Sequence, residues 1–469
     1  MRICAKYSAI SAKYSAISAK YSACSAFRCR LLRLMIMNPS ELHNAAHDLT
    51  NTAQPVTVVK KPRRLRALAG KLLLILFGIF VGVLLAEITL WLVGYSYPEF
   101  YQPDESLGFA LRPGMEGWYR KESQAYIRIN SDGLRDREHS KAKPAGTFRI
   151  ALLGDSYAEA FQVAMEDSFW AIMERKLNEC GAFDRKRIEV INFGVSGYGT
   201  AQELLTLRER VWSYSPDLVM LAITTNNDVS DNVRSLKKTD RVPYFVYQDA
   251  RLVEDDSFKR TRTFRWRRSS IAGVGRWFED HSRLVQAIER AQLRLKIWLA
   301  SKRSNSALSQ IKTDRAAAPT SEDELGVDNL IYREPRDAVW TDAWRVTEGL
   351  IAIMRDEVQS HQAKFLVVTL SNGIQVYPNP EARESFLKRV DAKDLFYPDK
   401  RIGTFCAKEG IAVITLAPGM QAYADQNKTF LHGFPGSIGF GHWNSLGHRV
   451  AGELIAAELC GGCRPEIVS

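Results

Sequence analysis

Two hydrophobic patterns alternate along the chain from Phe148 onward. Short continuous apolar runs, typical of strands buried on both faces, are separated by longer stretches with the three-to-four-residue apolar spacing of amphipathic helices. The predicted strands are 148–153, 188–193, 217–223, 364–370 and 411–416. The predicted helices are 167–179, 201–213, 340–361, 382–394 and 446–460. This alternation predicts an α/β fold with a parallel sheet covered by helices on both faces.

The third and fourth predicted strands are separated by an unusually long segment, about residues 230–340. It contains a candidate short strand at 244–247 and one basic amphipathic helix at about 274–302. The helix is either a lid packed on the domain or a contact surface for a membrane or substrate. Basic helices are commonly solvated faces, which favours the lid.

A different pattern runs from Leu72 to Tyr95, where Glu87 is the only charged residue. A helix of this length crosses the roughly 30 Å hydrocarbon core of a bilayer. The basic cluster at 60–66 predicts a cytoplasmic N-terminus and an extracytoplasmic main domain, periplasmic if the source is bacterial. Because the run is long and has no small-x-small cleavage site at its end, we expect a retained single-pass anchor.

Charge is distributed unevenly along the chain. The formal net charge is +11, and the first 71 residues hold 13 Lys or Arg against 2 Asp or Glu. The remainder is balanced, which argues against a nucleic-acid-binding surface. Residues 5–25 hold three near-identical heptads too short to bury a core, so we expect repetitive DNA translated upstream of a true start near Met35 or Met37.

Gly154-Asp155-Ser156 follows the first predicted strand of the main domain directly and precedes a segment that can begin a helix. A serine at this point lies at the carboxyl edge of the sheet, next to the positive end of a helix. Nucleophilic serines are usually built at such places. The alternative is an N-cap serine beside a turn-forming aspartate.

Polar or glycine-rich loops also follow other predicted strands. They contain Gly197 after the second strand, Asn227 and Asp228 after the third, and His442 after the last. Because parallel strands end at one edge of a sheet, we expect these residues to meet Ser156 there. Together they supply a nucleophile, oxyanion donors and a base. Taken singly, each could be a turn residue or a packed loop histidine.

These blocks, in this order, resemble the motifs of the SGNH/GDSL hydrolases, and the anchor resembles that of many bacterial members. The resemblance implies a three-layer α/β/α sandwich with a flavodoxin-like sheet. It implies Ser156 as nucleophile and His442 as general base. The Ser156 and Gly197 N–H groups and the Asn227 side-chain amide would form the oxyanion hole, with Asp155 and Asp228 in support.

One position departs from the family pattern. The family usually has an aspartate three residues before the histidine, and that position is Gly439. The carboxylate orients the imidazole and stabilises its charged form. Its place could be taken by a carbonyl or by another acid, of which Asp425 is the nearest upstream. The remaining possibilities are a Ser–His dyad or feeble catalysis.

The sequence predicts neither a metal nor a cofactor. His432, His442 and His448 with Asp155 and Asp228 could hold metals as in metallophosphoesterases, but their spacing matches no dense ligand motif.

The cysteines carry one further signal. The single pair at Cys460 and Cys463 favours a local disulfide or two inert thiols over a zinc site.

The resemblance and the patterns give four regions: 1–59, disordered or upstream of the true start; 60–97, basic flank and anchor; 98–147, lead-in segment; and 148–462, a hydrolase domain with the 230–340 insertion. The predicted function is a membrane-anchored serine esterase cleaving ester or O-acyl groups, with glycans and lipids as candidate substrates. The alternatives are an O-acyltransferase acting on a cell-envelope glycan and a catalytically weak binding domain of the same fold.

Overall fold

The structure is a computed structural model that describes residues 63–311, 329–461 and 467. The predictions for residues 1–59 and for Cys463 lie outside these ranges. The chain divides into two compact units, Met1–Phe80 and Val81–Ser469, and the fold below belongs to the second.

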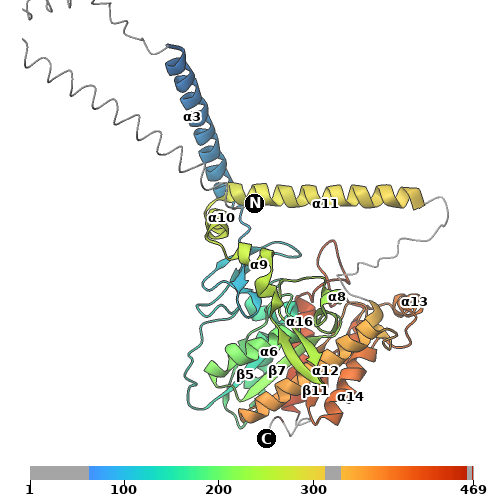
Figure 1. The fold of residues 1–469 in the computed structure, drawn as a ribbon. Coiled ribbons are helices and arrows are strands. Elements are labelled where there is room, and N and C mark those ends of the chain that lie inside the picture. Colours follow the sequence, from blue (N-terminus) through green and yellow to red (C-terminus); the bar gives the residue numbers. More distant parts are fainter. Residues whose placement is uncertain (1–62, 312–328, 462–466, 468–469) are drawn as a thin grey trace, which may run out of the picture. The chain divides into compact units, whose positions relative to one another are not determined.

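A five-stranded parallel sheet forms the centre of this unit (Figure 1). Its strands are β5 (Thr147–Gly154), β6 (Arg187–Asn192), β7 (Leu218–Thr224), β10 (Lys364–Leu370) and β11 (Ala412–Thr415). The spatial order is β11-β10-β7-β5-β6, which is the flavodoxin-like order with the chain reversing direction across the sheet beside β5. All five predicted strands are confirmed: β5, β7 and β10 are almost completely buried, and the edge strands β6 and β11 are partly exposed.

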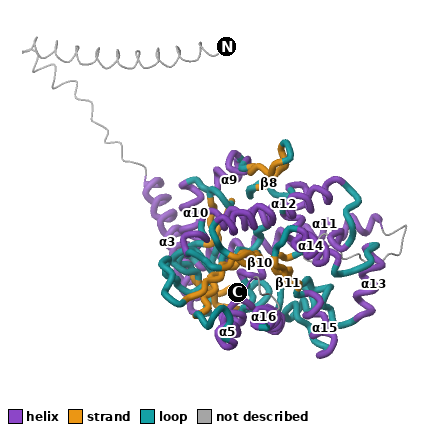
Figure 2. Tube along the Cα trace, turned by 90° about the horizontal axis from the view of Figure 1, so that it is seen from below, coloured by secondary structure: helices purple, strands orange, loops and turns teal. Residues whose placement is uncertain are grey.

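Helices cover both faces of the sheet. The first face packs on α6 (Thr200–Glu209), α12 (Ala338–Ser360) and α14 (Tyr397–Lys408). The second packs on α5 (Phe169–Cys180), α15 (Ala417–Asn427) and α16 (Ser445–Cys460), of which α5 and α16 lie side by side (Figure 2). Alternate residues of each strand point to opposite faces, so that Leu153 joins the first core and Leu152 the second. The predicted three-layer sandwich is confirmed.

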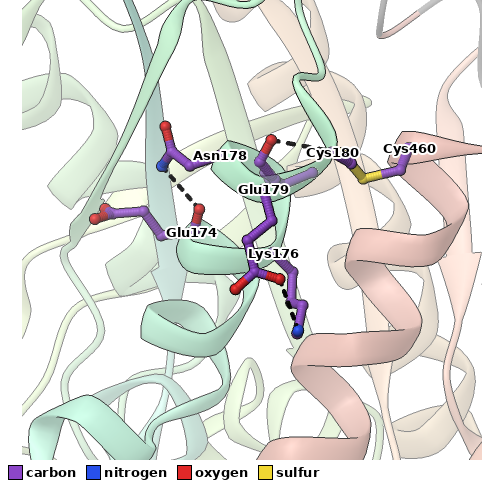
Figure 3. The surroundings of a disulfide bond; sticks show 7 residues. Glu174, Lys176, Asn178, Glu179, Cys180 and Cys460 are labelled. Atoms are coloured by element: carbon purple, nitrogen blue, oxygen red, sulfur yellow. Dashed lines mark hydrogen bonds and ion pairs between the residues drawn. A yellow bond between two sulfur atoms is a disulfide. The ribbon is translucent and has the colours of Figure 1, made fainter.

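A disulfide joins Cys180 at the end of α5 to Cys460 at the end of α16 (Figure 3). The two Cα atoms are 6.2 Å apart across a sequence separation of 280 residues. The prediction of a local disulfide or inert thiols at Cys460 is therefore wrong, because α16 ends beside the end of α5. Structural disulfides are typical of oxidising compartments.

The lead-in segment contains regular secondary structure. It holds two antiparallel hairpins, β1 (Tyr101–Asp104) with β2 (Gly108–Leu111), and β3 (Glu116–Tyr119) with β4 (Ala125–Arg128). Leu111 and Ile127 are buried in the core on the first face of the sheet. The hairpins are therefore part of the packed domain.

The insertion contains the predicted short strand as β8 (Tyr244–Gln248), paired with β9 (Arg251–Asp255). The single helix predicted at 274–302 is wrong: the chain forms α10 (Ser270–His281) and α11 (Arg283–Ile311). Ser282 has extended backbone angles and ends α10, which separates the two helices.

The remaining shorter α-helices of the described residues are α4 (Ser156–Glu159), α7 (Asn227–Asp231), α8 (Arg234–Lys237), α9 (Arg262–Arg267) and α13 (Pro380–Val390).

The apolar N-terminal run forms a helix, α3 (Arg63–Leu92). Its segment Ala67–Leu92, 26 residues, is long and apolar enough to cross a membrane. By length and composition it is a candidate membrane span.

Candidate active site

Ser156 begins α4 directly after β5 ends at Gly154. Asp155 is the N-cap residue, and its side chain accepts a hydrogen bond from the Tyr157 N–H at 3.0 Å. A Cβ on Gly154 would lie 2.9 Å from the Ala158 Cβ, so only glycine lets the helix turn so tightly on the strand. This geometry places Ser156 at the carboxyl edge of the sheet, as predicted.

His442 lies in the loop before α16, and its Nε2 is 2.8 Å from the Ser156 Oγ. The loop is fixed by an isolated bridge between His432 and Trp443, and by a 2.7 Å hydrogen bond between His432 Nδ1 and the Gly441 carbonyl. The structure thus brings together two predicted site residues that are 286 positions apart in the sequence.

The third member of this chain of hydrogen bonds is Glu122, which the sequence analysis did not identify. Its Oε2 lies 2.7 Å from His442 Nδ1. Glu122 occupies the turn between β3 and β4, where Tyr119 donates a 3.4 Å hydrogen bond to its other oxygen. A lead-in hairpin, which precedes the sheet in sequence and packs on it, therefore supplies a carboxylate to the histidine.

Electrostatics favour the charged form of Glu122. Partial burial acts to raise the pKa of Glu122, but the hydrogen bond and the charge interaction with His442 outweigh it, and the net pKa shift is downward. The side chains of His442 and Glu122 keep 22% and 29% of their exposure, so both stay within reach of solvent. A carboxylate held this way can orient the ring and stabilise an imidazolium.

The loop geometry explains why position 439 carries no acid. Gly439 has a φ of +88°, and a Cβ there would lie 2.6 Å from a ring carbon of Tyr377. An aspartate would be strained and crowded at this point. The other candidate, Asp425, forms a bidentate ion pair with Arg383 at 2.8 and 2.9 Å, so its suggested role beside His442 is wrong.

The two remaining oxyanion candidates lie on neighbouring loops. Gly197 has a φ of +80°, and the Ser196 N–H beside it donates to Glu159 of α4 at 3.1 Å. Asn227 begins α7 and lines one cavity with Tyr157 and His442. Both residues are thus at the same edge of the sheet as Ser156.

That cavity measures about 80 Å³. Its walls come from the loops after β7 and β10, from the histidine loop, and from Asn329 and Tyr332 at the end of the insertion. The insertion therefore contributes to the wall of the site.

The supporting acids Asp155 and Asp228 are fully buried with Glu203 of α6. Burial is the main cause that raises the pKa of all three groups. Asp228 accepts a hydrogen bond from the Thr224 N–H at 2.7 Å, and Asp155 accepts one from the Thr224 hydroxyl at 3.0 Å. Neither oxygen of Glu203 has a hydrogen-bond partner among the described residues.

The two other histidines near the site are structural by their surroundings. Burial lowers the pKa of His432 to about 4 and that of His448 to about 3, so both are neutral at physiological pH. His448 Nδ1 accepts a hydrogen bond from the Phe169 N–H at 3.3 Å. His432 stabilises the loop through the Gly441 carbonyl, and His448 joins α16 to the start of α5.

The fold and the site together define an α/β/α protein with a serine, a histidine and a glutamate in hydrogen-bonded order at the carboxyl edge of its sheet. A scan of protein-family models and a search of curated proteins gave no match. Solved structures gave distant matches that cover most of the matched chains.

One match is the acetyl xylan esterase AlAXEase, at 15% identity and a TM-score of 0.33, covering 66% of this chain and 99% of that chain. Another is a catalytic mutant of Axe2, an acetylxylan esterase from Geobacillus stearothermophilus, at 10% identity and a TM-score of 0.33, with coverages of 68% and 96%. A third is LAE5, an alpha/beta hydrolase from the metagenome of Lake Arreo, Spain, at 13% identity and a TM-score of 0.31, with coverages of 67% and 95%. Likeness at this level carries no argument about activity.

Proposed function

We propose that the protein is a membrane-anchored serine esterase of SGNH type, acting on ester or O-acyl groups outside the cytoplasm. The observation that carries the proposal is the hydrogen-bonded series Glu122–His442–Ser156, with distances of 2.7 and 2.8 Å. A nucleophile, a base that touches it and a carboxylate that orients the base are the parts that acyl transfer requires.

In this mechanism the Ser156 Oγ attacks the ester carbonyl carbon while His442 Nε2 takes the hydroxyl proton. When the tetrahedral intermediate collapses, the bond between the carbonyl carbon and the alcohol oxygen breaks. His442 gives its proton to the departing alcohol oxygen. Water then attacks the acyl-serine, with His442 taking its proton and returning it to Ser156. Glu122 remains a carboxylate and stabilises each imidazolium.

The oxyanion would be bound by the N–H groups of Ser156 and Gly197 and by the Asn227 side chain. The positive end of α4 adds to this, since α4 begins at Ser156. Removing one side-chain donor of this kind costs about 10²–10³ in turnover in another serine hydrolase. The position of Asn227 on the cavity wall beside His442 supports this role.

The cavity of about 80 Å³ lies beside His442 and offers space for an acyl group. O-acyl groups on an extracytoplasmic glycan or lipid headgroup are therefore the proposed substrates, in line with the disulfide and the candidate span.

Glu122 also weakens the case for a binding domain that has lost catalysis. That alternative depended on the missing acid at Gly439, and a carboxylate from the lead-in hairpin takes its place beside the histidine.

The test is labelling of the full-length, detergent-solubilised protein with a fluorophosphonate probe. We expect wild type to be labelled, Ser156→Ala not to be labelled, and His442→Ala to be labelled far more slowly. Ser385→Ala, an exposed serine on α13, is the matched control and should react like wild type. Equal labelling of Ser156→Ala and wild type would disprove the assignment of the nucleophile.

A further inference from the structure

The outward face of α10 exposes large apolar side chains with helical spacing. Ile271, Val274 and Phe278 follow one another at intervals of three and four residues, and are 78%, 57% and 50% exposed. Trp277 flanks this stripe and is 55% exposed. A solvated helix of a soluble domain does not normally gather four such side chains on one face.

The next helix continues the same surface. On α11, Ile288, Leu295 and Leu299 fall on one face and are exposed. Near the start of α11 the opposite face packs on the lead-in residues, where Gln286 is buried. Further along, Leu293 lines the same cavity but is 49% exposed, so apolar side chains of α11 remain uncovered on more than one side. Figure 1 shows α10 next to the start of α11.

Basic residues predominate in and around these helices. Residues 262–298 hold nine Lys or Arg against three Asp or Glu. The three acids are directed inward or neutralised: Asp280 pairs with Arg112 at 2.6 Å, and Glu279 and Glu289 line the cavity beside the lead-in segment. Several basic residues are paired too: Arg268 with Glu105, Arg283 with Ser96, and Arg290 over the Tyr97 ring. Arg294 and Lys296 are exposed beside the apolar stripe of α11. The surface there is apolar and cationic, which complements an anionic lipid surface.

The start of α11 is tied to the candidate membrane span. Glu87 of α3 accepts hydrogen bonds from the N–H groups of Arg283 and Leu284, and so caps the N-terminus of α11. Glu87 lies five residues before the end of α3 at Leu92, about 7–8 Å along a helix axis. If α3 spans the bilayer, this depth is that of the boundary between headgroups and acyl chains.

We propose that α10 and α11 lie in the outer membrane–water interface, with their apolar stripes in the acyl boundary and their arginines and lysines on anionic headgroups. The proposal rests on α3 being a membrane span. The protein would then be held to the bilayer by one membrane-spanning helix, α3, and by the interfacial helices α10 and α11, here called the surface belt. Trp277 and Trp298 would belong to the aromatic layer that favours this depth.

The test uses the full chain in nanodiscs of phosphatidylcholine with and without phosphatidylglycerol. A benzophenone amino acid replaces Leu295 on the proposed lipid face, Ser385 on α13 as a solvent control, or Ile79 within the span as an insertion control. After irradiation, lipid adducts are counted by mass spectrometry. We expect adducts at 295 and 79, several-fold above those at 385.

The outcomes test the membrane span and the interfacial position of α11 separately. Adducts at 79 without adducts at 295 would leave the span intact and overturn the surface belt. The absence of adducts at 79 would instead contradict the span itself. Adducts at 295 to a second protein copy would mean that the stripe is a protein interface, and would also overturn the proposal.

A charge variant tests the anionic partner. In Arg294→Glu with Lys296→Glu, adducts at 295 should fall several-fold in phosphatidylglycerol nanodiscs and change less in pure phosphatidylcholine. The exposed pair Lys388→Glu with Arg389→Glu on α13 is the matched control. Equal adduct yields for both variants in both lipids would contradict recognition of anionic headgroups.

Discussion

Two sets of carboxyl groups surround Ser156, and they differ in charge. Glu122 is partly exposed, is paired with His442, and has a lowered pKa. Asp155, Asp228 and Glu203 are completely buried, and burial raises the pKa of each. The carboxyl group with the lowered pKa thus lies on a hairpin at the edge of the domain, and the acids with raised pKa values lie inside it.

The difference shows what each environment can support. A buried carboxylate loses its hydration, which disfavours the charged form and raises the pKa. A carboxylate that must stabilise an imidazolium needs the opposite surroundings: a partner within hydrogen-bond distance and some solvent. The β3–β4 turn provides both. Of the interior acids, Asp155 and Asp228 accept hydrogen bonds from the backbone N–H groups of Tyr157 and Thr224 beside the nucleophile.

The largest expected effect comes from removing the charge of Glu122. Glu122→Gln keeps the size of the side chain but allows the wrong histidine tautomer, and the analogous change in trypsin costs ~10⁴ in turnover. We expect kcat/KM on a short-chain acyl ester to fall by about 10²–10⁴. Glu116→Gln, on β3 of the same hairpin, should retain wild-type kcat/KM. Similar values for both variants would remove Glu122 from the mechanism.

A smaller effect is expected from Glu159, a buried acid on α4. Burial raises the pKa of Glu159 to about 7, above the ordinary 4.5. Between these values the folded state keeps a proton that the unfolded state releases, so this group lowers stability as pH rises through the window. The change should be roughly 1–3 kcal/mol.

Thermal unfolding in detergent at about pH 5 and about pH 7.5 measures this difference. Glu159→Gln should reduce the loss of stability between the two pH values, while retaining acceptors for Ser196 and Tyr101. An unchanged pH dependence in the variant would mean that Glu159 titrates at its ordinary value when folded.

The smallest effect is expected from Glu203. If this acid is neutral when folded, Glu203→Gln replaces one uncharged group by another of the same shape. The free energy of unfolding should change by no more than about 1 kcal/mol. Chemical denaturation of wild type and variant gives the comparison. A loss of several kcal/mol would show that a charged Glu203 is required, and the contrast with Glu122 would disappear.

The sheet was predictable because parallel strands buried on both faces leave a continuous apolar signal, and its topology brings the loops after those strands to one edge. Ser156 and His442 were found this way. The helices α14 and α15 were not predicted: each begins with a proline in its first turn, and Pro418-Gly419 in α15 resembles a turn.

Glu122 could not be found from local pattern. It lies 320 positions from His442, on a short hairpin with no motif of its own. The only signal was indirect: Gly439 stands where the family has an acid, and an acid from elsewhere in the chain was one of several alternatives. The Cys180–Cys460 pairing was hidden for the same reason, since it depends on two helix ends meeting across 280 residues.

The most direct test of the account is the rate at which Ser156 reacts with a fluorophosphonate in wild type and in Glu122→Gln, with the modified residue identified by peptide mass spectrometry. The account predicts that the label is on Ser156 in both proteins and that the reaction is slower by about two or more orders of magnitude in Glu122→Gln. Equal rates, or a label on another serine, would contradict it.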